Sequence, residues 1–428
     1  MLNSSIILFI SLIVVRIITI KQKYRYAYNE FGITEMIICL LIFIFSIVHF
    51  KEIKNNKKIG FLDKPLIYAY IFRLFLLFWD LYFRNIYNLP NSGSDTEHFY
   101  KIAVRIAYGY NIQYMFFTTC IGNLFKIIGI SRLFVQFLLM LCSMVTLYII
   151  CIILTKLKIP PNEQNKIILI IGLLPNFAIL SSIFLRESLI TMFVTISVYF
   201  FICWMQEKKN RYFIYSFIMV LMAAAFHSGV IALLAGYMVI QYIYVKDEDK
   251  FNFNVKNLLP VMIFIIIFIY LYQNHSETFF TKMQNIDSIE DISSNLERGN
   301  SSYAKYVGAS KGINGIMLYS LPRMFYFLFS PLPWQWRGIP DIIAFTFSSL
   351  FYMYIIFTVY NYLLLNRRNN RNHNILISLV IISISSLFVF AWGCNNTGTA
   401  TRHRDKMMSI YSIMLAIIND ESKKTYNK

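Results

Sequence analysis

Charged side chains are scarce in this chain. They make up 14% of its 428 residues, whereas hydrophobic residues make up 57%. A soluble protein of this length would form about two or three domains and would contain about 25% charged residues. The mean hydropathy is +0.55, and apolar runs of roughly 20 residues, the length that crosses a bilayer core, recur from end to end. The composition therefore excludes an ordinary soluble protein and predicts an integral membrane protein.

Acidic residues are also few. Lys and Arg outnumber Asp and Glu by 40 to 22, which gives a net charge of +18. In a soluble protein this surplus would indicate a nucleic-acid partner. Here much of it lies in short loops between apolar runs, where Lys and Arg set the orientation of a membrane protein. We therefore expect membrane lipids, and no nucleic acid, as partners.

Motifs for nucleotide and metal chemistry are absent from the sequence. It contains no P-loop, no G-x-G-x-x-G, no H-E-x-x-H and no clustered D-x-D. The six cysteines are scattered, and no pair has the spacing of a metal or redox site. We expect them to be small buried side chains. The sequence thus predicts no cofactor and no metal.

The apolar runs predict an all-α helical bundle with about twelve transmembrane helices and with irregular or re-entrant segments, in one integral membrane domain over 1–428. The predicted spans lie near 4–20, 32–50, 65–85, 132–155, 167–183, 188–205, 212–226, 228–245, 257–273, 341–364, 374–393 and 405–419. The first run contains Arg16 and lacks a cleavage site, so it is interpreted as a membrane helix and not as a signal peptide. The 114–129 run is predicted to be re-entrant or interfacial, and 99–110 an amphipathic interfacial helix.

Basic residues orient these spans. With the N-terminus inside, the connections 51–64, 156–166, 206–211, 246–256 and 366–373 are cytoplasmic, and each contains at least three Lys or Arg. Lys21, Lys23 and Arg25 disagree with this orientation. The outer connections contain the unusual polar residues and a long extracytoplasmic loop at 274–320. A transporter would place such residues at mid-membrane, so their distribution favours a site at the outer surface.

The strongest candidate site lies between the last two spans, where the sequence reads NNTGTATRHRDK over 395–406. Arg402, His403, Arg404 and Lys406 are expected at the positive N-terminus of a re-entering helix, where they would be unfavourable without a bound anion. Arg recognises phosphate through two parallel hydrogen bonds. The alternative, contact with lipid headgroups, accounts for one arginine better than for the whole run.

Two further outer connections contain ionisable pairs. Asp95, with Glu97 close behind, follows a turn and precedes the 99–110 helix. It could act as a general base at the mouth of the bundle or simply cap that helix. Arg186 and Glu187 lie between two apolar spans, where charge is costly. They could bind and orient an anion, or neutralise each other in a tight turn.

Four other residues are candidates, and structural roles are open for them as well. His227 could transfer protons or bond between helices. Trp334 and Trp336 could stack on sugar rings or mark the membrane boundary. Arg323 lies in the same proline-rich region and could contact phosphate.

Four short windows resemble bacterial oligosaccharide repeat-unit polymerases of the Wzy type, which act in O-antigen and capsule assembly. They are GSD at 93–95, LRES at 185–188 after Pro175, LPR…FSPLPW at 321–334 and NTGTATRHRDK at 396–406. The resemblance implies a GT-C-like, metal-independent glycosyltransferase of the bacterial inner membrane with its active site facing outside. It would join undecaprenyl-diphosphate-linked oligosaccharides, with a chain-length regulator and a flippase as expected partners.

The resemblance also implies roles for the candidate residues. Arg186, Arg323, Arg402, Arg404 and Lys406 would bind the diphosphate; Asp95, Glu187 and His403 are the candidate bases; Trp334, Trp336 and His227 would contact sugar. The alternatives are another polyprenyl-phosphate-dependent glycosyltransferase, an O-antigen ligase, or a flippase of lipid-linked oligosaccharides.

Overall fold

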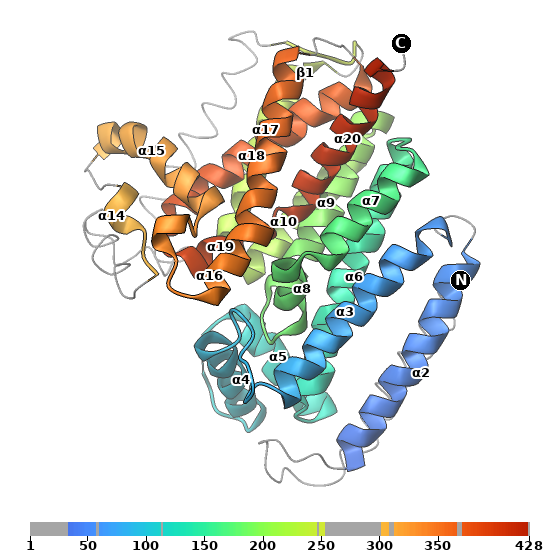
Figure 1. Ribbon diagram of the computed structural model, residues 1–428, viewed down its shortest axis with the longest axis vertical. Helices are drawn as coiled ribbons and strands as arrows, with labels where there is room; N and C mark the ends of the chain where they lie inside the picture. The colour runs from blue at the N-terminus through green and yellow to red at the C-terminus, as the bar shows by residue number, and fades with distance from the viewer. Residues whose placement is uncertain are drawn as a thin grey trace. The chain divides into compact units, whose positions relative to one another are not determined.

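The computed structural model describes residues 33–56, 60–112, 114–245, 248–252, 301–307, 312–365 and 370–426 (Figure 1). These residues are almost entirely helical, with one short antiparallel hairpin of β1 (Tyr244–Val245) and β2 (Lys250–Phe251). The prediction of an all-α protein is therefore confirmed. The predicted spans 4–20 and 257–273 lie outside the described residues. The chain divides into two compact units, Met1–Cys151 with Pro160–Leu189, and Ile152–Ile159 with Ile190–Lys428.

The first unit is built from helices that follow one another closely in the sequence. They are α2 (Ile33–Asn55), η1 (Gly60–Leu62), α3 (Asp63–Tyr82), α4 (Ser94–Ala107), α5 (Phe116–Ile128), α6 (Arg132–Lys156) as far as Cys151, α7 (Pro161–Leu173) and α8 (Pro175–Ser182). The predicted amphipathic helix is α4, which buries Phe99, Ile102, Ala103 and Ile106 along one face. This face packs against α5, where the absence of a side chain at Gly122 lets Ile106 approach closely.

The predicted span 167–183 is broken. Its two parts, α7 and α8, meet at an angle of 58°, because Leu174 is extended and Pro175 has no N–H to continue the helix. The break leaves carbonyls at the end of α7 without helical partners. Arg73 of α3, which is fully buried, donates to the Gly172 carbonyl and to Ser143 Oγ, the latter at 3.0 Å. Its guanidinium thus compensates for the broken helix.

The second unit contains the remaining elements. They are α9 (Glu187–Glu207, which begins in the first unit), α10 (Asn210–Phe226), η2 (Ser228–Ile231), α11 (Ala232–Ile243), the β hairpin, α14 (Ala304–Val307), α15 (Gly312–Phe329), η3 (Pro333–Gln335), α16 (Ile339–Ala344), the π-helical turn η4 (Phe345–Ser349), α17 (Leu350–Leu365), α18 (Arg371–Trp392), α19 (Thr397–Asp405) and α20 (Met408–Tyr426). Its core lies along α20, which is buried almost continuously from Met408 to Ile418.

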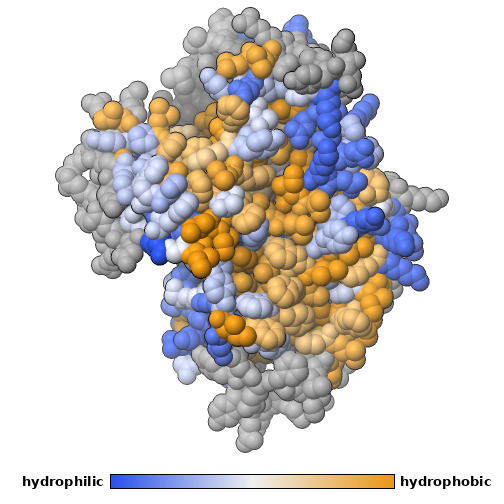
Figure 2. All heavy atoms as spheres, in the orientation of Figure 1, coloured by the Kyte–Doolittle hydropathy of each residue, from blue (hydrophilic) through white to orange (hydrophobic). Residues whose placement is uncertain are grey.

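Four helical segments of the described chain are long and apolar enough to cross a membrane. They are Arg132–Lys156, Glu187–Glu207, Ile339–Leu365 and Arg371–Trp392, and the bent pair α7 and α8 would make a fifth. Apolar side chains cover much of the visible surface in Figure 2. Phe43, Phe75 and Ile170 are examples of large apolar side chains left exposed on α2, α3 and α7. These features support a membrane protein.

Two predicted segments differ in detail from the structure. The helix that contains the last predicted span, α20, begins at Met408, because a separate short helix, α19, precedes it. The predicted loop 274–320 is helical from Gly312 onward, since α15 continues through Pro322. A helix can continue past a proline when neighbouring groups bind the carbonyl that the proline leaves exposed.

Close packing of α11 on α18 provides a test of the second unit. A Cβ added at Gly236 would lie 2.7 Å from Ile382 Cα and 2.9 Å from Ser385 Oγ. We expect Gly236→Ala to destabilise the protein by about 1–3 kcal/mol through overpacking, measured as a lower melting temperature in detergent. The control Gly338→Ala places its Cβ no closer than 3.8 Å to Pro340 and should melt like the wild type. Equal melting of the two variants would contradict this packing.

Candidate functional site

The short helix α19 organises the candidate residues of the second unit. Asn396 caps its start by accepting hydrogen bonds from the backbone N–H groups of Gly398 (2.9 Å) and Thr399 (3.3 Å). The helix ends at Asp405, so Arg402 and His403 lie in its last turn. Cations there face the negative end of the helix dipole and are favourable. The prediction that they crowd a positive helix N-terminus is therefore wrong, because it merged α19 with α20.

Residues 301–303 hold the start of α19 in place. Ser302 pairs with Asn396 in an antiparallel bridge. The N–H of Tyr303 donates to the Asn395 carbonyl at 2.9 Å, and the N–H of Thr397 donates to the Ser301 carbonyl at 3.0 Å. The part of the chain that the sequence assigned to a long outer loop thus reaches the strongest candidate site.

Arg404 is the most deeply buried cation of α19, with 1% of its surface exposed. Its guanidinium donates to the carbonyls of Leu328 (2.6 Å) and Ser330 (2.8 Å) where α15 ends, and to Ser348 Oγ at 3.1 Å. It also lies over the ring of Tyr352, at 5.4 Å from the centroid. These protein contacts favour a structural role for Arg404 over the diphosphate contact predicted from the sequence.

Arg323 and Lys406 are buried in the same unit. Arg323 of α15 donates to Asn395 Oδ1 at 2.8 Å and stacks over Trp392 at 4.4 Å. Lys406, directly after α19, is fully buried, and its Nζ lies 5.8 Å from the centroid of the Phe390 ring. Arg323 therefore contacts the segment just before α19, and Lys406 directly follows that helix.

Arg402 and His403 of α19 are partly exposed, as are Gly398 and Thr399 near its start. His403 meets His227, which lies between α10 and η2: their Nε2 atoms are 3.1 Å apart and their ring centroids 4.5 Å apart. The structure thus brings His227 against His403, the sequence neighbour of Arg402, so that candidates from two distant sequence windows meet.

The two candidate tryptophans lie on η3 and directly after it. Trp334 is 59% exposed and Trp336 39% exposed. The indole N–H of Trp336 donates to the Pro331 carbonyl at 3.3 Å, and its ring packs against Phe345. The exposed ring of Trp334 is therefore the better surface for stacking.

The other candidates belong to the first unit. Arg186 donates to Met115 Sδ at 3.1 Å and lies 6.0 Å from the centroid of the Phe99 ring. Glu187 is buried at the start of α9. Asp95 is exposed in the first turn of α4. The protected position expected of a general base is therefore not found for Asp95, nor does Asp95 cap α4, whose N-cap is Gly93.

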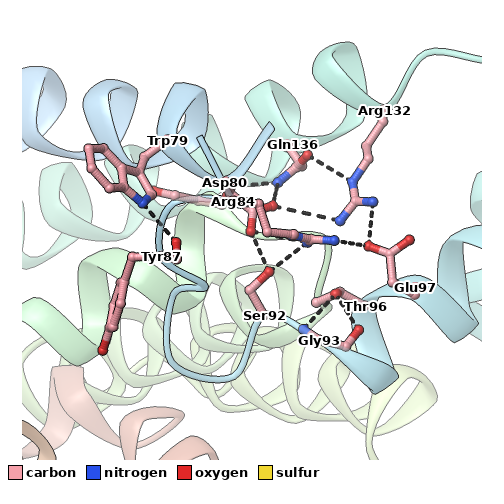
Figure 3. A network of polar contacts seen from close by, with 11 residues as sticks. Trp79, Asp80, Arg84, Tyr87, Ser92, Gly93, Thr96, Glu97, Arg132 and Gln136 are labelled. Carbon is pink, nitrogen blue, oxygen red and sulfur yellow. Dashed lines mark hydrogen bonds and ion pairs between the residues drawn. The ribbon is translucent and has the colours of Figure 1, made fainter. Parts of the chain in front are cut away.

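The sequence did not predict the most extensive polar network of the first unit, which Figure 3 shows. Glu97 of α4 accepts hydrogen bonds from Arg84, after α3, and from Arg132 of α6, the second at 2.6 Å. Buried Asp80 accepts from Arg84 at 3.1 Å and from Gln136 Nε2 at 2.8 Å. Two arginines and two carboxylates here neutralise one another. The network therefore ties α4 to α3 and α6 and provides no excess charge for a ligand.

The Glu97 carboxylate gives this network a pH dependence. Burial alone would raise the pKa of Glu97, but the charge of Arg132 and the hydrogen bonds from Arg84 and Arg132 outweigh burial and hold the pKa below its ordinary value. A carboxylate with a lowered folded-state pKa stabilises the protein above its unfolded-state pKa, and this contribution is lost as the pH falls through the folded-state value.

We therefore expect Glu97→Gln to lower the melting temperature at neutral pH. The difference from the wild type should shrink as the pH falls below about 4.3, the ordinary glutamate value. The adjacent exposed His98 provides the control variant His98→Gln, which should show no such trend between pH 3 and 5 (approximate range of glutamate titration). A difference that stays constant with pH would mean that the charge of Glu97 does not stabilise the network.

Among the described residues, no three His, Cys, Asp or Glu side chains come together as metal ligands could. Comparison with known proteins identifies no relative: no family model, no curated protein and no solved structure matches the chain. The site must therefore be interpreted from its own chemistry.

Proposed function

We propose that this protein is a polymerase that joins undecaprenyl-diphosphate-linked oligosaccharide repeat units into O-antigen or capsular polysaccharide. In this proposal it lies in a bacterial inner membrane as a GT-C-like bundle of about twelve helices, with its active site outside. The observation that supports it best is the charge around α19. Arg402, Arg404 and Lys406 follow one another with Asp405 as the single intervening acid, and Arg323 borders the same helix. Charged side chains buried in a membrane protein, as Arg323 and Lys406 are, commonly mark a functional site.

In glycan transfer, these cations would stabilise the leaving diphosphate. The acceptor hydroxyl attacks the anomeric carbon of the donor while the bond from that carbon to the diphosphate oxygen breaks. The lipid diphosphate leaves with the electron pair, and preorganised cations stabilise its developing charge. Arg402, the partly exposed arginine of α19, is the first candidate for contact with the leaving diphosphate. Arg323 and Lys406 are the next candidates, and Arg186 is the candidate in the first unit.

The acceptor hydroxyl must also lose a proton, which requires a base. Asp95, Glu187 and His403 are the candidates. Of these, His403 belongs to the same helix as Arg402, and a histidine changes protonation state near neutral pH. The exposed ring of Trp334 offers a stacking surface for a sugar of the repeat unit.

Three alternatives share part of this chemistry. Another polyprenyl-phosphate-dependent glycosyltransferase or an O-antigen ligase would use the same cations with a different donor or acceptor. A flippase would bind the same lipid diphosphate without breaking a bond. A glycan ladder separates these functions.

The test compares surface glycans from cells that lack the protein with those from cells complemented with the wild type. The proposal predicts single repeat units in the deficient cells and a restored ladder on complementation. Unjoined units that accumulate on the cytoplasmic side would identify a flippase. Full-length polymer that remains on its carrier lipid would identify a ligase, and either result would overturn the proposal.

A further inference from the structure

We propose that Lys158 and Lys208 bind the headgroup of an anionic phospholipid at one end of the second unit. Lys158 follows the end of α6, and Lys208 follows the end of α9. Both helices are long and apolar enough to cross a membrane, and both lysines are exposed. The proposal does not depend on the glycan chemistry proposed above.

Both lysines have a left-handed backbone conformation, with φ of 59° at Lys158 and 62° at Lys208. After α6, the N–H of Ile159 donates to the Leu154 carbonyl at 3.0 Å, and after α9 the N–H of Lys208 donates to the Trp204 carbonyl at 2.9 Å. These bonds are typical of helix ends at which the chain turns left-handed. Glycine is the usual residue there, because it has no Cβ to oppose a positive φ.

The fold does not explain why lysine stands at these two positions. A cation near the negative end of a helix is stabilised, but by less than the left-handed conformation costs a residue that has a Cβ. Among the residues that the structure describes, neither Lys158 nor Lys208 forms a salt bridge. Local strain without a structural benefit is typical of positions with a functional role. We therefore expect the two ammonium groups to serve a ligand.

Three candidate membrane spans end together where these lysines lie. Lys156 Nζ of α6 is 2.8 Å from Glu207 Oε1 of α9. Asn372 Nδ2, near the start of α18, donates to the Leu157 carbonyl at 3.2 Å. The ends of α6 and α9 and the start of α18 are therefore linked by direct contacts. The headgroups of a bilayer lie where its spans end, so a lipid headgroup is the ligand that this position favours.

Positive charge exceeds negative charge at these helix ends. Glu207 is also paired with Lys209, at 3.3 Å, and Asp249 of the β hairpin is paired with Arg371 at 3.0 Å. Among the described residues of these helix ends and of the hairpin, the cations are Lys156, Lys158, Lys208, Lys209, Lys250 and Arg371, and the carboxylates are Glu207, Glu248 and Asp249. The surplus of cations favours an anionic headgroup over a zwitterionic one.

The same position favours a phospholipid over a free anion. Ile152 of α6 is 48% exposed and lies on the apolar part of the helix before Lys158, where it can contact an acyl chain. The connections after α6 and α9 are among those predicted to be cytoplasmic, and the cytoplasmic leaflet is rich in anionic lipids. A headgroup phosphate held by two ammonium groups, with its acyl chains beside α6, satisfies both observations.

The first test titrates the purified protein in neutral detergent with phosphatidylglycerol and measures bound lipid by native mass spectrometry. We expect Lys158→Gly and Lys208→Gly each to raise the dissociation constant about fivefold, and the double variant about 25-fold, from the usual contribution of one cation near an anionic surface. Lys158→Arg and Lys208→Arg keep the charge and should bind like the wild type. Lys126→Gln removes an exposed cation from α5 and is the control for net charge.

The second measurement is the melting temperature in neutral detergent without added lipid. Lys158→Gly and Lys208→Gly should melt at or above the wild-type temperature, because glycine relieves the left-handed strain. Melting below the wild type would mean that the lysines stabilise the helix ends themselves, and would overturn the proposal.

Three binding results would also overturn the proposal. They are unchanged phosphatidylglycerol affinity in the double glycine variant, equal retention of phosphatidylcholine by the wild type, and full competition by inorganic phosphate at the concentration of the lipid. The last result would identify a site for a free anion.

Discussion

Arg402→Ala is expected to lower the polymerisation rate by about 10²–10³-fold, the loss that follows removal of one preorganised donor to a developing anion. The protein should remain folded, since Arg402 is only partly buried at the end of α19. Arg402→Lys should recover part of the rate, because Lys restores the charge without the paired hydrogen bonds of a guanidinium. The measurement is product formed from lipid-linked repeat units at equal protein concentrations.

An exposed arginine of the same unit provides the control. Arg211, in the first turn of α10, lies over the ring of Tyr212 and takes no part in the proposed site. Arg211→Ala should polymerise like the wild type. If Arg402→Ala also did so, the cations of α19 would not serve the leaving diphosphate.

Arg404→Met is expected to fail in a different way, by destabilising the fold. Methionine fills much of the space but provides no donor for the carbonyls of Leu328 and Ser330 or for Ser348. Each buried acceptor left without a partner costs about 1–3 kcal/mol, so the total should be about 3 kcal/mol or more. The melting temperature in detergent should fall markedly and the yield of folded protein with it.

The comparison of the two arginines decides between their roles. Arg404→Lys should also be destabilised, because one ammonium group cannot reach all the acceptors that the guanidinium contacts. A variant of Arg404 that melts like the wild type but has lost activity would restore the sequence-based prediction that Arg404 contacts the diphosphate.

Helix positions were largely predictable from the sequence, whereas helix breaks were not. The apolar runs identified α6, α9 and α18 to within a few residues because length and hydrophobicity determine a span. Pro175 explains the break at Leu174 locally, but the Arg73 side chain that binds the Gly172 carbonyl comes from α3. The start of α19 likewise depends on contacts with residues 301–303. No local pattern predicts such contacts.

The candidate site was likewise predictable from the sequence only in part. The residue types at 402–406 indicated an anion site. The structure adds that Arg402 is partly exposed, whereas Arg404 is buried and donates to the carbonyls of Leu328 and Ser330. The Asp80–Glu97 network was missed, because its members lie on three elements whose contact no spacing rule predicts. The pairing of His227 with His403 was equally unpredictable, although each residue had been selected separately.

The most direct test of the polymerase uses the purified protein in lipid vesicles with a synthetic repeat unit on undecaprenyl diphosphate. The proposal predicts a ladder of joined units and release of one lipid diphosphate for each bond formed, both greatly reduced in Arg402→Ala. Intact substrate at long reaction times, or substrate moved across the bilayer without being joined, would contradict it.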